Sequence, residues 1–213
     1  MTVTLASAST RWRAPVSARL RIARTGRNPM SDLQLSTRPA TEDDFGWMLD
    51  LLERNQRVNV PEGERSKTGF IQGSWTEERL QERTDGPGMW VAEVDGERAG
   101  VVLSSDAAAH SDGPPGLTVA TAREAMPDAR FFLYGPAVVE ADQRGRGVLS
   151  ALVDALFTDA AENYDEAVAF VERSNSVSMS VHERLGFREV GTFEVDGREY
   201  VTFAHPTGGL RTA

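Results

Sequence analysis

The feature that most constrains the fold of this chain is a glycine-containing turn that joins a β-rich run to an amphipathic helix. The run covers residues 130–140, the turn is Gln143-Arg144-Gly145-Arg146-Gly147, and the helix that follows carries apolar residues at helical spacing, namely Leu149, Leu152, Val153, Leu156 and Phe157. Glycines at such a turn let the backbone approach a ligand, and the first N–H groups of a helix lack internal partners. The unit therefore predicts a site for phosphate or pyrophosphate.

The β-rich run is interrupted by Gly135-Pro136. Proline has no N–H to donate to a sheet, so we expect the strand to bulge or splay there. The turn is neither a P-loop, because Gly-Lys-[Ser/Thr] is missing, nor a dinucleotide-binding fingerprint, because it has only two glycines. An ordinary tight turn with solvated Arg144 and Arg146 is the alternative interpretation.

The remaining pattern predicts a mixed α/β fold in the order β-α-α-β-β-β-α-β-α-β-β. Alternating apolar residues indicate a first strand over residues 33–38, and Asp95-Gly96 and Asp196-Gly197 each indicate a hairpin turn. Thr41 caps a predicted helix, and a second short helix begins near Trp75. A further helix covers residues 174–185. Residues 107–118 contain Gly113-Pro114-Pro115-Gly116, so we expect a loop there, followed by one helical turn over residues 121–125.

Composition excludes several kinds of site. The 213 residues include no cysteine, which rules out disulfides, thiolate zinc sites and a cysteine nucleophile, and the three histidines lie far apart. We therefore predict no metal cofactor. No run of about 18 apolar residues occurs, so we expect no membrane span and a cytoplasmic location.

The formal net charge of −9 is unevenly distributed, because residues 1–29 contain six arginines and no acid. The acidic remainder would repel a phosphate backbone, which argues against nucleic acid as a partner and favours a cationic amine. Solubility is the simpler explanation of the same charge.

We expect three segments. Residues 1–30 form a tail outside the folded part: disordered, a leader, a basic arm, or untranslated if synthesis starts at Met30. Residues 31–206 form a single domain, and residues 207–213 a C-terminal tail.

Two motifs together resemble the GNAT superfamily of N-acetyltransferases. Residues 139–149 resemble its Arg/Gln-x-x-Gly-x-Gly/Ala motif after a strand, and residues 175–187 are similar to its Asn-x-x-(Ala/Ser)-x-x-x-Tyr-x-x-x-Gly-Phe segment. The resemblance covers roughly residues 35–203. It implies a GNAT fold, with a mostly antiparallel mixed sheet of six to seven strands, helices on both faces and a splayed central strand. It also implies transfer of an acetyl group from acetyl-CoA to a primary amine of a small molecule or protein, by direct attack on the thioester.

The resemblance also implies a set of cofactor-binding residues. The backbone of Ala137, Val138 and Val139 would pair with the pantetheine arm, and Asn175 and Ser178 would lie near the pantetheine or the reaction centre. Asn175 also suits a helix cap. The pyrophosphate would be held by the turn and the first residues of the helix, namely Arg144, Gly145, Arg146, Gly147, Val148, Leu149 and Ser150.

Two positions depart from the family pattern. Leu149 stands where Gly or Ala is usual, and His182 stands where the family commonly has the Tyr that protonates the departing thiolate. His182 is our candidate acid, and a residue that only packs is the alternative. Glu140, nearest to the motif, is the candidate base, although it could be a surface acid.

Three other ways of removing the amine proton stay open: Tyr134, Glu172 or a chain of water molecules. Residues 55–74 and 107–126 would set specificity, either by holding a cationic amine through aromatic and acidic side chains or as a solvated lid; the side chains in question are Phe70, Trp75, Glu62, Glu64 and Asp112. A non-catalytic coenzyme A-binding regulatory module, and more remotely a nucleotide-phosphate binder, are the alternative functions. We expect a monomer or homodimer.

Overall fold

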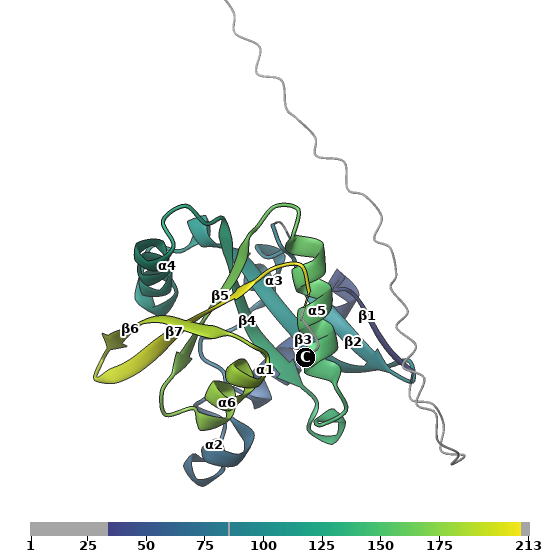
Figure 1. Ribbon diagram of the computed structural model, residues 1–213. Coiled ribbons are helices and arrows are strands. Elements are labelled where there is room, and N and C mark those ends of the chain that lie inside the picture. The colour runs from purple at the N-terminus through teal and green to yellow at the C-terminus, as the bar shows by residue number, and fades with distance from the viewer. Residues whose placement is uncertain (1–33, 85, 210–213) are drawn as a thin grey trace, which may run out of the picture.

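A computed structural model describes residues 34–84 and 86–209, and these form a seven-stranded sheet in the order β1-β2-β3-β4-β5-β7-β6 (Figure 1). The β4–β5 pair is parallel and the other neighbouring pairs are antiparallel. The strands are β1 (Leu35–Pro39), β2 (Trp90–Val94), β3 (Glu97–Asp106), β4 (Phe131–Val139), β5 (Glu166–Glu172), β6 (Arg188–Val195) and β7 (Arg198–Pro206). The helices are α1 (Phe45–Arg54), α2 (Glu62–Thr68), α3 (Glu77–Gln81), α4 (Gly113–Ala125), α5 (Val148–Ala160) and α6 (Ser176–Arg184).

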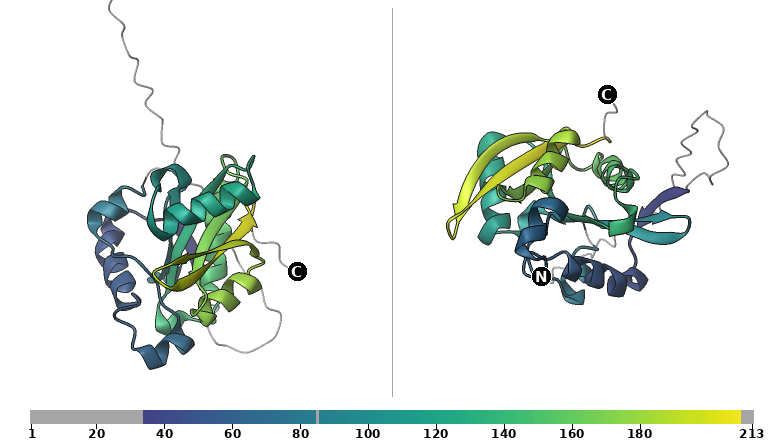
Figure 2. Two further views of the ribbon diagram at one scale, coloured as in Figure 1. Left: turned by 90° about the vertical axis from the view of Figure 1, so that its left-hand side faces the viewer. Right: turned by 90° about the horizontal axis from the view of Figure 1, so that it is seen from below.

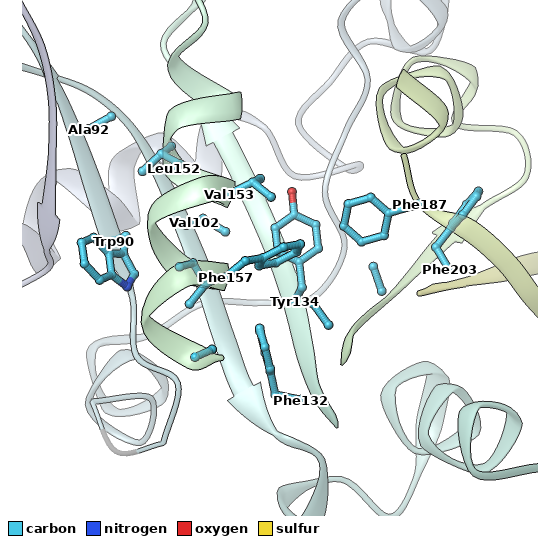
Figure 3. Packing of buried hydrophobic residues seen from close by; sticks show 14 of the residues in the cluster. Trp90, Ala92, Val102, Phe132, Tyr134, Leu152, Val153, Phe157, Phe187 and Phe203 are labelled. Carbon is cyan, nitrogen blue, oxygen red and sulfur yellow. The ribbon is translucent and has the colours of Figure 1, made fainter. Parts of the chain in front are cut away.

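One face of the sheet is covered by α5 and α6. Because successive residues of a strand point to opposite faces, Trp90 of β2, Val102 of β3 and Phe132 of β4 share this face with Leu152 and Phe157 of α5 (Figure 3). The buried aromatic rings meet edge to face, as Phe132 and Phe157 do with centroids 6.1 Å apart. This cluster is the larger part of the core.

The other face carries α1, α3 and α4, so helices lie on both sides of the sheet (Figure 2). Met48 and Leu52 of α1 pack on Val91 and Val101, the strand residues that alternate with those of the first face. Farther along the sheet, Ala122 of α4 packs against Leu133 and neighbouring residues of β4, β5 and β7. The opposite-face alternation thus divides the core into two layers.

The sheet opens between β4 and β5. Their parallel pairing covers only residues 131–133 of β4, and β4 then passes through Gly135-Pro136, opposite a register shift between Val102 and Ser104 of β3. Beyond this point β4 stays paired with β3 while β5 diverges (Figure 1). The splayed strand expected from Gly135-Pro136 is therefore present.

A buried carboxylate fixes the start of α1. Asp44 is fully buried and accepts hydrogen bonds from Arg38 and Arg98 at 2.7–2.9 Å and from the Thr41 backbone N–H. Burial alone would raise the pKa of Asp44, but these donors hold it well below its usual range. The interaction ties β1 and β3 to the helix that lies beneath them.

The predicted loop over residues 107–118 is wrong in its second half. The helix α4 begins at Gly113, with proline in its first turn, and continues to Ala125. Proline at the first helical positions lacks only an N–H that would be unpaired there, and its fixed φ suits a helix. The pair Pro114-Pro115 therefore starts a helix here. Helix α2 was expected only as part of a loop or broken helix.

The predicted fold class is confirmed: a mixed α/β fold with a mostly antiparallel sheet and helices on both faces. The expectations for residues 1–30 lie outside the described residues, as does most of the predicted C-terminal tail. Within residues 34–84 and 86–209, no helix has both the length and the apolar character needed to cross a membrane.

Candidate functional site

A cavity of about 1250 Å³ occupies the opening between β4 and β5. One end is formed by the second half of β4, the glycine turn and the start of α5. The other end is formed by residues 67–75, the region after α3 and residues 105–115. The volume exceeds the roughly 300–1,000 Å³ typical of small-ligand pockets, so it has room for a long ligand and a second small molecule.

The β4 edge that faces the cavity has unused backbone groups. The Glu140 N–H donates to the Ala99 carbonyl at 2.8 Å, and in an antiparallel pair the residues alternate between facing the partner strand and facing away. Val138 therefore faces β3, while the N–H and C=O groups of Ala137 and Val139 face the gap. The Val139 C=O accepts from Arg144, which leaves the two Ala137 groups and the Val139 N–H for a ligand. An extended amide-containing ligand can bond to this edge as a neighbouring strand would.

The glycine turn presents the free end of α5 to the same cavity. Gly147 is the N-cap of α5 with φ +83°, and a Cβ at Gly145 or Gly147 would meet no atom within 4 Å. The first intrahelical bond runs from the Ala151 N–H to the Gly147 carbonyl, so by helix geometry the N–H groups of Val148, Leu149 and Ser150 have no helical acceptor. Backbone donors in open space at a helix N-terminus favour an anion.

The two arginines of the turn differ in placement. Arg144 lines the cavity, where its side chain donates to the Val139 carbonyl at 3.3 Å and to the Asn55 side chain at 3.1 Å. Arg146 is exposed and is not among the lining residues. Of the twelve cofactor-binding residues expected from the sequence, Arg146 is the one that the structure leaves outside the cavity.

Asn175 and Ser178 lie at the start of α6 and line the cavity. Asn175 is 4% exposed and caps the helix by accepting from the Ser178 N–H at 3.3 Å, while its amide nitrogen donates to the Phe70 carbonyl at 2.8 Å. Asn175 therefore serves as a helix cap and also joins α6 to the segment that precedes α3. Its side-chain groups are engaged within the protein.

His182 lines the cavity but sits among aromatic rings. It is 7% exposed, stacks on Phe203 with centroids 5.2 Å apart, and meets Tyr134 and Phe187 edge to face. Nδ1 lies 2.8 Å from the Ser178 carbonyl, which requires a proton on Nδ1, and buried Nε2 has no hydrogen-bond partner among the described residues. Burial lowers the pKa of His182, which favours the neutral ring. The nitrogen without a partner thus carries no proton to give.

Tyr134 is a cavity residue whose hydroxyl is not engaged. It is the last β4 residue before the Gly135-Pro136 interruption, and its ring packs on Phe157 and Phe187 (Figure 3). No described residue forms a hydrogen bond with its hydroxyl. Burial raises the pKa of Tyr134 well above its usual value, so the hydroxyl keeps its proton at neutral pH.

The structure does not bring Glu140 to the cavity. Its carboxylate accepts from Trp47 at 3.1 Å and from both terminal nitrogens of Arg54 at 3.0 and 3.2 Å, on the side of the sheet covered by α1. It is not among the lining residues. Glu140, proposed from the sequence because it is nearest to the motif, is thus an ion-pair partner that fixes α1 to the end of β4.

Glu172 is a carboxylate that does line the cavity. It ends β5, is 5% exposed, and accepts a hydrogen bond from Gln72 at 2.8 Å and another from Ser174. Arg57 lies 3.4 Å away. The sequence named Glu172 only as an alternative, because nothing in a one-dimensional pattern shows which strand-end acid faces the opening.

Phe70 and Trp75, the aromatic residues expected to contact a cationic amine, contact arginine side chains instead. The guanidinium carbon of Arg57 lies 5.5 Å from the Phe70 ring centroid and that of Arg83 lies 4.8 Å from the Trp75 ring centroid. Asp112 lines the cavity, but Glu62 and Glu64 do not. Arg57, Gln72 and Arg83 were missed from the sequence, where they look like ordinary polar surface residues.

A sequence model of the acetyltransferase (GNAT) family matches residues 49–187. The chain belongs to this family. The match contains both the glycine turn and the Asn175–Phe187 segment, so the resemblance inferred from these motifs is confirmed. Among the described residues, no group of three or more His, Asp or Glu side chains could hold a metal ion.

Individual proteins that the chain is similar to include acetyltransferases. The chain is 33% identical over 104 residues to a phosphinothricin N-acetyltransferase of Streptomyces coelicolor; the match covers 42% of this chain and 61% of that protein, less than two thirds of its length. Its fold resembles an N-acetyltransferase from Staphylococcus aureus Mu50 (TM-score 0.54, 19% identity, 81% and 98% of the two chains). It also resembles yncA from Salmonella typhimurium, solved with its cofactor acetyl-CoA (TM-score 0.55, 14% identity, 86% and 98%).

Proposed function

We propose that this GNAT protein is an N-acetyltransferase that moves an acetyl group from acetyl-CoA to a primary amine. The observation that carries the proposal is the meeting, in one cavity, of an unpaired β4 edge and the free N-terminus of α5. The edge suits the two amides of a pantetheine arm, and the helix end suits a pyrophosphate. Coenzyme A joins these two groups in one molecule.

When bound, acetyl-CoA supplies a thioester whose acetyl carbon is attacked by the amine nitrogen, with loss of the coenzyme A sulfur. The chain's contribution is to position the two reactants and to move two protons. We assign the first proton, released by the amine, to Glu172, because it is the buried carboxylate at the opening, where Arg57 lies 3.4 Å from it.

We assign the second proton, needed by the leaving sulfur, to the Tyr134 hydroxyl. It is protonated at neutral pH and has no competing acceptor among the described residues. His182 is the position at which the family commonly has a Tyr, but its proton is held on Nδ1 against the Ser178 carbonyl. In this proposal His182 supports the Tyr134 ring, and the proton lost from Tyr134 is replaced by the one that Glu172 received or by solvent.

The second candidate function is a non-catalytic coenzyme A-binding module of the same fold. It is favoured by the replacement of the usual Tyr on α6 by a neutral, buried His182. Both functions use the same cofactor end of the cavity, so binding alone does not separate them.

Two measurements test the proposal. A thermal shift with acetyl-CoA, compared with ATP, tests the cofactor; stabilisation by ATP alone would contradict it. Release of free thiol over a panel of amines then tests transfer. The panel includes phosphinothricin, because of the Streptomyces coelicolor relative, and lysine-containing and N-terminal peptides. Tight binding of acetyl-CoA without turnover of any amine would favour the non-catalytic module.

A further inference from the structure

We call the end of the cavity formed by residues 67–75, the region after α3 and residues 105–115 the acceptor end. It contains the guanidinium group of Arg83, most of whose N–H groups have no hydrogen-bond acceptor among the described residues. Of the five N–H groups of Arg83, one on Nη1 has an acceptor among the described residues, the Arg79 carbonyl at 3.0 Å. Nε is shielded from solvent and unpaired. Neither residues 34–84 nor residues 86–209 supply an ion pair to Arg83, whose planar group lies over the Trp75 ring.

A second donor in the same place is also unpaired. Nε1 of Trp75, the ring beneath Arg83, is buried without an acceptor among the described residues. Indole and guanidinium N–H groups can only donate, so this cluster has an excess of donors. Unpaired buried donors are unfavourable, and a ligand that brings acceptor oxygens would satisfy them.

Charged side chains of both signs line this part of the cavity, because Glu82, Asp106 and Asp112 lie there as well as the arginines. Arg79 precedes Arg83 by four residues, and both line the cavity together with His110. The acid Asp106 is already engaged by the Ala108 N–H and the Tyr164 hydroxyl, and Glu82 is exposed and makes no ion pair with Arg83 in the described structure. Burial lowers the pKa of Arg83 and the charge of Arg79 adds to this, while Glu82 opposes it. Within the part of the chain that the structure describes, none of the three acids forms an ion pair with Arg83, so its guanidinium has donors to offer to a ligand.

We infer that the acyl acceptor carries an anionic oxygen group, a carboxylate or a phosphorus oxyacid, that Arg83 binds in the cavity. The amine acceptor is then a small molecule of the amino-acid type, with its anionic end at the Arg83–Trp75 cluster and its amine toward the opening near Glu172. This deepens the proposed function and rests on it. A planar guanidinium suits such a group because it can donate two parallel hydrogen bonds to two oxygens.

The test uses matched acceptors with the full chain and acetyl-CoA. Thiol release is measured for an α-amino acid, its primary carboxamide, its decarboxylated amine and the corresponding aminoalkylphosphonate. We expect the two anionic acceptors to have a KM about ten- to hundredfold lower than the neutral ones, the loss expected when a charge-assisted hydrogen bond is removed. The carboxylate and phosphonate arms show which oxyacid is preferred. Equal KM values across all four acceptors would overturn the inference while leaving the acetyltransferase proposal intact.

Variants of Arg83 supply the second arm. Arg83→Gln should raise the KM of the anionic acceptors to that of the carboxamide, with the KM of acetyl-CoA unchanged, and Arg83→Lys should restore part of the preference. Arg130→Gln removes an exposed arginine that pairs with Asp165, outside the cavity, and should keep the full preference. An unchanged preference in Arg83→Gln would also overturn the inference. If the wild-type chain neither binds acetyl-CoA nor releases thiol with any amine, the proposed function itself fails, and the inference fails with it.

Discussion

The two ends of the cavity are built in different ways. The cofactor end comes from one continuous stretch, residues 137–150, and offers mainly backbone groups: the edge of β4, a glycine turn and the N-terminus of α5. The acceptor end is assembled from residues 67–83, residues 105–115 and the end of β5, and offers side chains such as Arg83 and Glu172.

We expect recognition at the two ends to depend on side-chain identity to different degrees. Backbone groups recognise an amide or a phosphate whatever the neighbouring side chains are, so we expect the cofactor end to tolerate Leu149 where the family motif commonly has Gly or Ala. Side chains select the acceptor by charge and shape, and substitutions in surface segments can alter those side chains without disturbing the sheet. Four experiments, taken in order of decreasing expected effect, test this division and the residue roles proposed with it.

Neutralising a carboxylate inside the cavity should lower kcat much more than neutralising a carboxylate outside it. Glu172→Gln keeps a side chain that can hydrogen-bond to Gln72 but accepts no proton, so we expect kcat to fall about hundredfold or more. Glu140→Gln removes the ion pair with Arg54 and should lower stability with kcat near that of the wild type. Steady-state kinetics and thermal melting measure both. Equal losses of kcat would contradict the assignment of Glu172 as the general base.

Gly147→Val should damage the cofactor end selectively. At φ +83° a β-branched residue is strained, and relief of the strain would move the N–H groups of the first turn of α5. We expect the affinity for acetyl-CoA, measured by titration calorimetry, to fall by about tenfold or more. Gly46→Ala is the matched control, because Gly46 lies in α1 with nothing within 4 Å and an ordinary φ. Undiminished binding in Gly147→Val would disprove the phosphate-site assignment.

Tyr134→Phe tests the proton donor. The ring and its packing on Phe157 are kept and only the hydroxyl is lost, so the free energy of unfolding should change little while kcat falls about tenfold. His182→Phe preserves a ring among Phe187 and Phe203 and should lower kcat less. A larger loss in His182→Phe than in Tyr134→Phe would assign the proton to His182, as first expected from the sequence.

The smallest expected effect is on the pH dependence of stability. Burial holds the pKa of His182 below the roughly 6.5 of an unfolded chain. As pH falls below 6.5, the unfolded chain gains a proton that the folded protein does not, so the free energy of unfolding decreases by at most about 1.4 kcal/mol per pH unit from this group. Denaturant unfolding at pH 7.5 and 5.5 should show a smaller decrease for His182→Phe than for the wild type. His110, whose pKa burial also lowers, supplies a similar decrease that both proteins share.

Much of the fold was predictable because its signals are local. The Asp95-Gly96 and Asp196-Gly197 turns, the apolar period of α5 and the interruption at Gly135-Pro136 each depend on a few adjacent residues, and the structure has the two hairpins, the helix and the opening in these places. Only the last part of helix α4, residues 121–125, was predicted, because Gly113-Pro114-Pro115-Gly116 has the composition of a turn. Packing of Ala122 and its neighbours on β5 and β7 supports a helix that local propensity does not favour.

By itself the sequence determined the family, and it located the cofactor end that we propose, since both are carried by contiguous motifs whose chemistry is that of the backbone. Only the tertiary structure decided which side chains face the cavity. It placed Glu140 against Arg54 and Trp47, Glu172 at the opening, and Arg83 over Trp75. Trp47, Arg54 and Gln72, which donate to the two carboxylates, lie 86 to 100 positions away from them in the chain, a separation that a linear pattern of residue types does not encode.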